Sequence, residues 1–245
     1  MPHETIDVQT EDGICPVHTF GPAGPGQWPG VLLFMDGHGV RPALFEIAER
    51  LASSGYVVAV PDLYYRTGYR APAGATLFTD PVARAHWTEH ILPTLSIANV
   101  MRDVPAFGDY LASRPDVRAG RIGVTGYCLG GRLALATAGH YPGLVAAVAS
   151  YHGGHLATDA PDSPHRLAPK ITARVYVGGA RDDASFDEPQ RTRLEAALRE
   201  AGVDYRIEMY DARHGWVPSD TAAHDAAAAE RHWRTLLELF DATLR

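Results

Sequence analysis

The chain has 245 residues, of which 46% are hydrophobic and 21% charged, a composition that supports a folded core and argues against disorder. The formal net charge of −7 argues against nucleic-acid and anionic-membrane partners, because both require a basic face. Two cysteines, Cys15 and Cys128, are too few for a secreted disulfide scaffold. Neither a signal peptide nor an apolar run of about 18 residues is present, so we expect a cytoplasmic protein.

Short apolar runs follow one another along the chain. The first two, Glu4–Gln9 and Ile14–Phe20, flank the turn Glu11-Asp12-Gly13 and predict an antiparallel hairpin. The later runs are apolar without alternation, which indicates strands buried on both faces, as in a parallel sheet. These runs are Val31–Met35, Tyr56–Val60, Arg121–Thr125, Leu144–Tyr151, Arg174–Val177 and Tyr205–Tyr210.

Amphipathic stretches separate the apolar runs and predict helices. The stretch Asp80–Ser113 is expected to be helical in two pieces, because Pro93 and Pro105 interrupt it. A hairpin followed by strand–helix repeats predicts one α/β domain over residues 1–245, with a mostly parallel central sheet and helices on both faces. The other predicted helices are Pro42–Ser54, Pro189–Ala201 and Thr221–Leu244.

The most informative segment is Gly126-Tyr127-Cys128-Leu129-Gly130, which lies between a predicted strand and an alanine- and leucine-rich stretch. Its G-x-nucleophile-x-G spacing is typical of a sharp strand-to-helix turn, where side chains at the glycine positions would collide with neighbouring elements. A helix N-terminus also favours the thiolate form of Cys128. The amide of Leu129 would face a developing oxyanion. Most free cysteines are core residues, but the two glycines favour a nucleophile here.

The partners of such a nucleophile should follow it in the order acid, then histidine. Asp182 and Asp183 follow the predicted strand Arg174–Val177, and only one of them can face the histidine, because neighbouring side chains point in different directions. His214 follows the last predicted strand and is the expected base. The loop after Val31–Met35 should supply a second oxyanion donor, the amide of Gly37.

These motifs resemble the dienelactone hydrolase family. The resemblance lies in Gly126-Tyr127-Cys128-Leu129-Gly130-Gly131, with Pro61-Asp62-Leu63-Tyr64 upstream and His214-Gly215 downstream. It implies an α/β-hydrolase fold whose Cys-His-Asp triad cleaves small esters or lactones without a cofactor. It also favours Asp183 over its substitute, Asp182, as the acid.

The resemblance further implies a role for Asp36. The family usually places a glutamate at this position, which contacts the resting thiol and moves aside when substrate arrives. Asp36 is one methylene shorter, and the alternative is that it hydrogen-bonds its own loop. Members that act on dienelactone hold the substrate carboxylate with two arginines; one of these positions is Pro218 here, so the match fails, and Arg84 is a candidate for the other.

Several loop residues are candidate pocket walls. The expected partner is a small ester or lactone, and the sequence carries no signal for an oligomeric state. A rival hypothesis is a non-catalytic protein of the same fold that binds a small ligand. The pattern His86-Trp87-Thr88-Glu89-His90 resembles a zinc-peptidase motif, but the helix is broken and lacks a third carboxylate, so we expect no metal. The wall candidates are Tyr127, Tyr64, Arg84, Trp87, His152 and Trp216.

Overall fold

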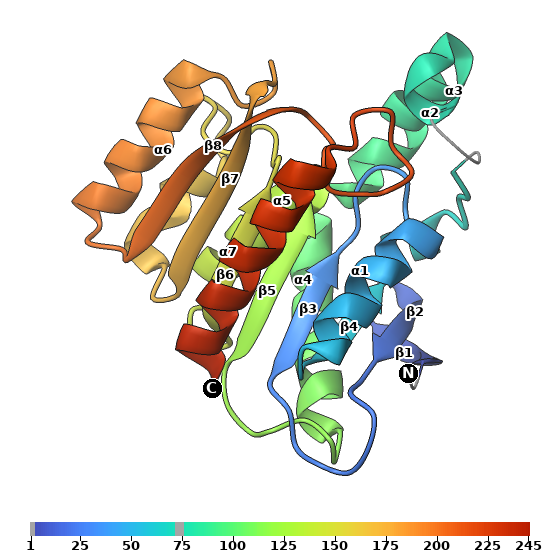
Figure 1. Ribbon diagram of the computed structural model, residues 1–245. Coiled ribbons are helices and arrows are strands. Elements are labelled where there is room, and N and C mark those ends of the chain that lie inside the picture. The colour runs from blue at the N-terminus through green and yellow to red at the C-terminus, as the bar shows by residue number, and fades with distance from the viewer. Residues whose placement is uncertain (1–2, 72–75) are drawn as a thin grey trace.

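One eight-stranded sheet organises the chain in the computed structural model, which describes residues 3–71 and 76–245 (Figure 1). The strand order is β1-β2-β4-β3-β5-β6-β7-β8. Strands β1 (His3–Thr10) and β2 (Gly13–Phe20) form the predicted antiparallel hairpin, and β2 also pairs antiparallel with β4. The remaining pairs are parallel, which confirms a mostly parallel sheet. The later strands are β3 (Gly30–Phe34), β4 (Val57–Pro61), β5 (Ile122–Tyr127), β6 (Val145–Tyr151), β7 (Arg174–Asp182) and β8 (Tyr205–Arg213).

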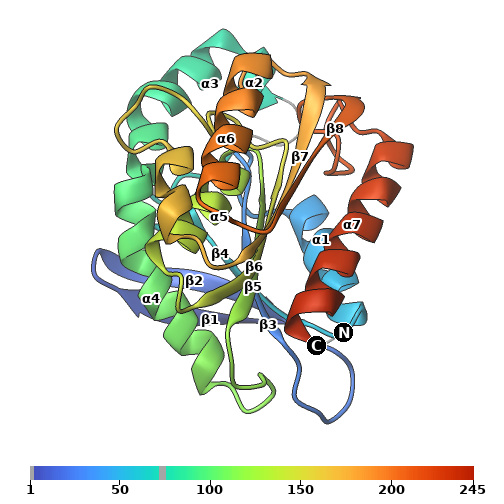
Figure 2. The same cartoon turned by 90° about the vertical axis from the view of Figure 1, so that its left-hand side faces the viewer.

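Helices cover both faces of the sheet, as Figure 2 shows. Helices α1 (Pro42–Ser53) and α7 (Ala226–Leu244) lie on one face, and α4 (Ile97–Ser113), α5 (Leu129–His140) and α6 (Glu188–Glu200) lie on the other. Two short helices, α2 (Thr76–Thr79) and α3 (Pro81–His86), lie beyond the carboxyl ends of the parallel strands. Within residues 3–71 and 76–245, no helix is both long and apolar enough to cross a bilayer.

The direction of the chain reverses at the centre of the sheet. The chain moves from β3 to β4 on one side and then crosses back to β5 on the other side of β3. The connecting helices α1 and α5 consequently lie on opposite faces of the sheet. This is the topological switch point at which α/β sheets form binding crevices.

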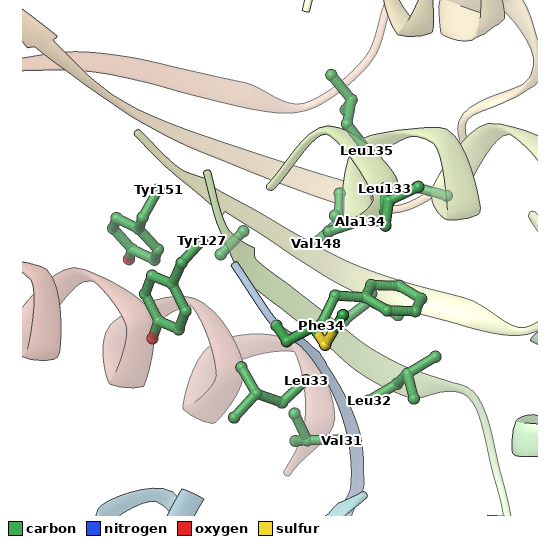
Figure 3. Packing of buried hydrophobic residues seen from close by; sticks show 14 of the residues in the cluster. Val31, Leu32, Leu33, Phe34, Tyr127, Leu133, Ala134, Leu135, Val148 and Tyr151 are labelled. Atoms are coloured by element: carbon green, nitrogen blue, oxygen red, sulfur yellow. The ribbon is translucent and has the colours of Figure 1, made fainter. Parts of the chain in front are cut away.

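The core is centred on the middle strands. Val31, Leu32, Leu33 and Phe34 of β3 are all fully buried, as expected for a strand with helices on both faces. Figure 3 shows them packed together with side chains of the neighbouring elements. The continuous apolar runs in the sequence therefore correspond to the centre of the sheet.

The prediction that Pro105 interrupts its helix is wrong, because α4 continues through this residue. Proline lacks the amide that would bond the carbonyl four residues earlier, which here belongs to Met101. The hydroxyl of Tyr141 donates to that carbonyl instead. Pro93 does end the first helical piece, since Leu92–Leu95 forms a turn of 3₁₀ helix before α4 begins.

The closing helix begins later than predicted. Asp225 caps α7 by accepting a hydrogen bond from the amide of Ala228 at 2.8 Å, so the helix starts at Ala226. Thr221 instead donates its hydroxyl to the carbonyl of Gly215 at 2.7 Å. The segment between β8 and α7 is therefore a folded loop and not the first turn of a helix.

Removing part of a β3 side chain tests how strongly the core supports this architecture. We expect Leu32→Ala to lower the free energy of unfolding by roughly 2–5 kcal/mol, because it leaves a cavity in a fully buried strand. Urea unfolding followed by circular dichroism measures the change. The matched control is Ile14→Ala on β2, where the side chain is 57% exposed and we expect a change within about 0.5 kcal/mol. Equal losses in the two variants would contradict the placement of the core.

Candidate active site

A sharp turn joins β5 to α5 and presents the side chain of Cys128. Cys128 has φ 56° and ψ −120°, a strained conformation for a residue with a side chain. A Cβ on Gly126 would lie 2.3 Å from the carbonyl oxygen of Gly130, and one on Gly130 would lie 2.4 Å from that of Met35. Both positions therefore require glycine. The amide of Leu129, the first residue of α5, has no acceptor within the helix.

Asp183 and His214 meet because β7 and β8 end side by side. Asp182 pairs with Arg213 in the parallel register, so the next residue of each strand emerges at the same edge. Nδ1 of His214 lies 2.6 Å from Oδ2 of Asp183. The other carboxylate oxygen, Oδ1, accepts from the amide and hydroxyl of Ser185 at 2.8 and 2.6 Å. Of the two aspartates, Asp183 thus presents its carboxylate to the histidine, whereas Asp182 is exposed and offers only its backbone carbonyl.

His214 and Asp183 each stabilise the charged form of the other. Burial alone would lower the pKa of His214, but the electrostatic interaction with Cys128 and hydrogen bonds with Asp183 and Cys128 raise it to about 10. Burial alone would raise the pKa of Asp183, but the interactions with His214 and Ser185 hold it below its ordinary value. The imidazole therefore lies between a sulfur and a carboxylate, and both favour its protonated form.

His152 is a second histidine at the site and remains neutral. It lies directly after β6 with φ 38°, and its ring centroid is 5.1 Å from that of His214. Complete burial, together with the positive charge of His214, lowers its pKa well below the ordinary value. Its Nδ1 accepts a hydrogen bond from the amide of Cys128 at 3.1 Å, so the proton of the neutral ring lies on Nε2. His152 therefore contacts the backbone of the turn without competing for the charge that His214 carries.

The loop after β3 carries Gly37, and side-chain hydrogen bonds fix its conformation. The hydroxyl of Tyr64 donates to the carbonyl of Gly37 at 2.5 Å and accepts from Nε1 of Trp87 at 2.8 Å. The amide of His38 donates to Oδ1 of Asp36 at 2.9 Å, so the peptide unit between Gly37 and His38 is bonded at both ends. Tyr64 and Trp87, predicted as pocket walls, instead support this loop.

Asp36 is paired with an arginine in its own loop. Its Oδ1 and Oδ2 lie 2.7 and 3.0 Å from Nη1 and Nη2 of Arg41. Arg41 also binds Asp220, with Nε–Oδ2 and Nη2–Oδ1 distances of 2.6 and 3.0 Å. The structure thus favours the alternative arrangement of Asp36, bonded within its loop, over the predicted position against the thiol of Cys128. The Arg41 bridge, by which we mean the contacts among Asp36, Arg41 and Asp220, joins the loop after β3 to the loop after β8.

A pocket of about 320 Å³ opens beside the sulfur. Five predicted site residues meet there: Asp36, Gly37, Cys128, His152 and His214. Residues of α2 and of the loop after β8, together with His38, complete the lining. Among these, only Gly215 belongs to a motif that the sequence had indicated. The full lining is Asp36, Gly37, His38, Phe78, Thr79, Cys128, His152, His214, Gly215, Thr221, Ala222 and Ala223.

The other predicted walls lie outside this lining. Tyr127 points into the core, where its hydroxyl is 2.9 Å from Nε2 of His232 on α7. Trp216 is fully buried and stacks on Tyr210 with a centroid distance of 4.7 Å. Arg84 is exposed on α3. Their positions next to the motifs in sequence therefore did not predict the direction of their side chains.

Ser185 was missed by the sequence analysis, although a local signal was present. An aspartate whose carboxylate accepts from the amide two residues later forms an Asx turn, and serine is common in such turns. Asp183-Ala184-Ser185 fits this pattern. The serine adds its hydroxyl as a second donor to the same carboxylate oxygen.

The zinc-peptidase pattern does not form a metal site. Residues His86 and His90 are exposed, with ring centroids 5.0 Å apart, and Glu89 lies in a π-helical turn between them. Across the described ranges 3–71 and 76–245, no group of three or more histidine, cysteine, aspartate or glutamate residues is arranged to hold a metal ion.

Replacing the carboxylate next to His214 tests the electrostatics. We expect Asp183→Asn to lower the pKa of His214 from its value of about 10, because the variant removes a negative charge and a hydrogen-bond acceptor from the protonated ring while the interaction with Cys128 remains. Proton NMR titration of the His214 ring measures the pKa. Asp182→Asn is the matched control and should leave it unchanged, because that side chain is exposed. Equal shifts in the two variants would contradict the assignment of the carboxylate.

The raised pKa of His214 also makes stability depend on pH. A group whose pKa is higher in the folded state binds its proton more tightly there, so its contribution is complete below pH 6.5 and is lost as the pH rises through about 10. We expect the wild-type free energy of unfolding to fall across this window more than that of Asp183→Asn. Urea unfolding at a series of pH values measures both, and parallel curves would contradict the prediction.

Comparison with known proteins agrees with this architecture. The chain matches the model of the Dienelactone hydrolase family over residues 16–244. A provisionally named carboxymethylenebutenolidase of Escherichia coli O157:H7 is 32% identical, covering 88% of this chain and 77% of that protein. The carboxymethylenebutenolidase of Rhodococcus opacus is 29% identical, covering 98% and 91%. A solved structure of a provisionally assigned dienelactone hydrolase from Klebsiella pneumoniae subsp. pneumoniae MGH 78578 has a TM-score of 0.82 at 24% identity, covers 98% of both chains, and shows the α/β-hydrolase fold. The chain thus belongs to the dienelactone hydrolase family of hydrolases.

Proposed function

We propose that this protein hydrolyses small esters and lactones through an acyl-enzyme on Cys128. The observation that carries the proposal is the series sulfur, imidazole, carboxylate. It begins at Cys128 on the turn and passes through His214 to Asp183, 2.6 Å away. A nucleophile needs a base within hydrogen-bond reach and a third group that orients the base. The carboxymethylenebutenolidase names of two relatives support a lactone or related ester as the substrate class.

The first half of the reaction forms a thioester. His214 holds the proton of the thiol, and the thiolate of Cys128 attacks the carbonyl carbon to form the carbon–sulfur bond. The negative charge moves to the carbonyl oxygen, where the amides of Leu129 and Gly37 stabilise it. The tetrahedral intermediate collapses by breaking the bond to the alkoxide, which takes the proton from His214. In a lactone this alkoxide remains attached to the acyl group.

The second half releases the product. Neutral His214 removes a proton from water, and the resulting hydroxide attacks the thioester carbon. The second tetrahedral intermediate expels the thiolate and leaves a carboxylic acid. Asp183 keeps Nδ1 of the imidazole protonated, so that Nε2 is free to exchange protons with the sulfur and with water.

The nucleophile also restricts the substrates. A thiolate leaves more readily than an amine, so the tetrahedral intermediate formed from an amide returns to its reactants. Esters, thioesters and lactones have better leaving groups and proceed forward. We therefore place peptides outside the substrate range of this site.

Alkylation of the two cysteines tests the nucleophile. Cys128 is half-buried at the pocket, whereas Cys15 is fully buried and burial raises the pKa of its thiol. We expect iodoacetamide to label Cys128 stoichiometrically and to abolish turnover of p-nitrophenyl acetate. The variant Cys128→Ala should lose roughly 10⁴-fold or more in kcat/KM, as removal of a nucleophile typically does. Mass spectrometry and initial rates measure the two effects.

The matched control is Cys15→Ala, which should retain both labelling and turnover. Turnover that survives alkylation or the loss of Cys128 would exclude the proposed mechanism. Saturable binding of aryl esters without any turnover would instead support a non-catalytic ligand-binding protein on the same fold.

A further inference from the structure

We propose that the pocket selects uncharged substrates and discriminates against esters and lactones that carry a carboxylate close to the reacting carbonyl. This inference rests on the proposed function and narrows its substrate class. The observations behind it are the Arg41 bridge and the signs of the other charges around the pocket.

Every nitrogen of the Arg41 guanidinium already has an acceptor. Nη1 donates to Oδ1 of Asp36 at 2.7 Å and to the carbonyl of Gly39 at 3.1 Å. Nη2 donates to both Asp36 and Asp220 at 3.0 Å, and Nε donates to Asp220 at 2.6 Å. The side chain of Arg41 is 13% exposed and does not belong to the pocket lining, whereas the carboxylate of Asp36 does. The part of the Arg41 bridge that lines the pocket is therefore the negatively charged carboxylate of Asp36.

Among the described residues that line the pocket, no other side chain offers a free cation to a substrate carboxylate. The pocket lining, as far as residues 3–71 and 76–245 describe it, contains no lysine or arginine. The residues at 72–75 are Pro, Ala, Gly and Ala, which carry no charge. Burial lowers the pKa of His38 and keeps this ring neutral. Protonated His214 is already paired with Asp183.

A carboxylate on the substrate would consequently lose water without gaining a partner. Asp36, Asp183 and Asp220 contribute three negative charges around the pocket, against the positive charges of Arg41 and His214. Repulsion between like charges is strong where water is partly excluded. The remaining lining, which includes Phe78, suits an uncharged aryl or alkyl group. The pocket thus favours neutral aryl esters and small neutral lactones.

A pair of esters that differ only in charge tests this selectivity. The probes are meta-acetoxybenzoate, which carries a carboxylate, and meta-acetoxybenzamide, which carries an uncharged amide of the same shape. Each kcat/KM is divided by the rate constant for hydrolysis of the same ester by hydroxide, which corrects for the leaving group. We expect the corrected value to be at least about tenfold higher for the amide. Added salt should reduce the ratio, because it screens the repulsion.

A variant of the Arg41 bridge tests the origin of the selectivity. Asp220→Asn removes one carboxylate from Arg41 while leaving the proposed catalytic groups intact, so the ratio should fall by about threefold or more. The matched control is Glu230→Gln, which changes the same chemical group on another arginine. Glu230 binds Arg50 at 2.6 and 2.9 Å and lies outside the pocket lining, so the ratio should not change. Turnover of meta-acetoxybenzamide confirms that both variants are folded.

The outcomes separate this inference from the proposed function. Equal corrected rates, or faster hydrolysis of the carboxylate ester, would overturn the inference and leave the proposed function standing. Hydrolysis of neither ester would overturn both. A ratio that is the same in Asp220→Asn and in the Glu230→Gln control would overturn the assignment of selectivity to the Arg41 bridge.

Discussion

The close approach of three backbone segments at the β5–α5 turn is the constraint on which the site depends. The backbone of Gly130 lies so near the end of β3, and that of Gly126 so near the start of α5, that neither position has room for a Cβ. The chain must therefore turn within a single residue, and Cys128 takes a positive φ that costs of order 1–3 kcal/mol. The fully buried strands on either side pack around the turn and stabilise Cys128 in this strained conformation. Every other group of the site is placed relative to the sulfur that this turn exposes.

The parallel sheet brings the remaining groups to the same edge without any contact in sequence. Asp183 and His214 directly follow β7 and β8, and their neighbours pair across these strands. Gly37 follows β3, next to the turn, at the point where the strand order reverses. The pocket lies there, lined by Gly37 and Cys128 among others, and the connecting helices α1 and α5 lie on opposite faces of the sheet. The sheet topology thus determines where the site lies, and residues that follow the ends of the strands supply its side chains.

Sequence patterns were sufficient for features that depend on local spacing. The buried strands, the hairpin and the glycines of the turn appear where they were predicted, because period, turn residues and steric limits act over a few residues. Pro105 was misread, since the hydroxyl that compensates for its missing amide comes from Tyr141, on another segment. Likewise, the partner of Arg41 that completes its bridge, Asp220, lies 179 residues further along the chain.

The direction in which a side chain points was the other feature that the sequence did not predict. Tyr127 directly precedes Cys128 in the sequence, and this position predicted a place in the pocket wall. Neighbouring residues of a strand point to opposite faces, however, and its ring packs toward His232 on α7. Only the fold determines which face is core and which is cavity. The choice between Asp182 and Asp183 had the same origin, because it depends on which carboxylate points toward His214.

The support behind Gly37 has a thermodynamic consequence. Trp87 bonds Tyr64, Tyr64 bonds the carbonyl of Gly37, and Asp36 holds the next amide. The peptide dipole between Gly37 and His38 is thus oriented when the protein folds, and the free-energy cost of this orientation belongs to folding. Water molecules around an ester in solution must reorient each time the ester reacts. A peptide unit that is hydrogen-bonded at both ends keeps its orientation.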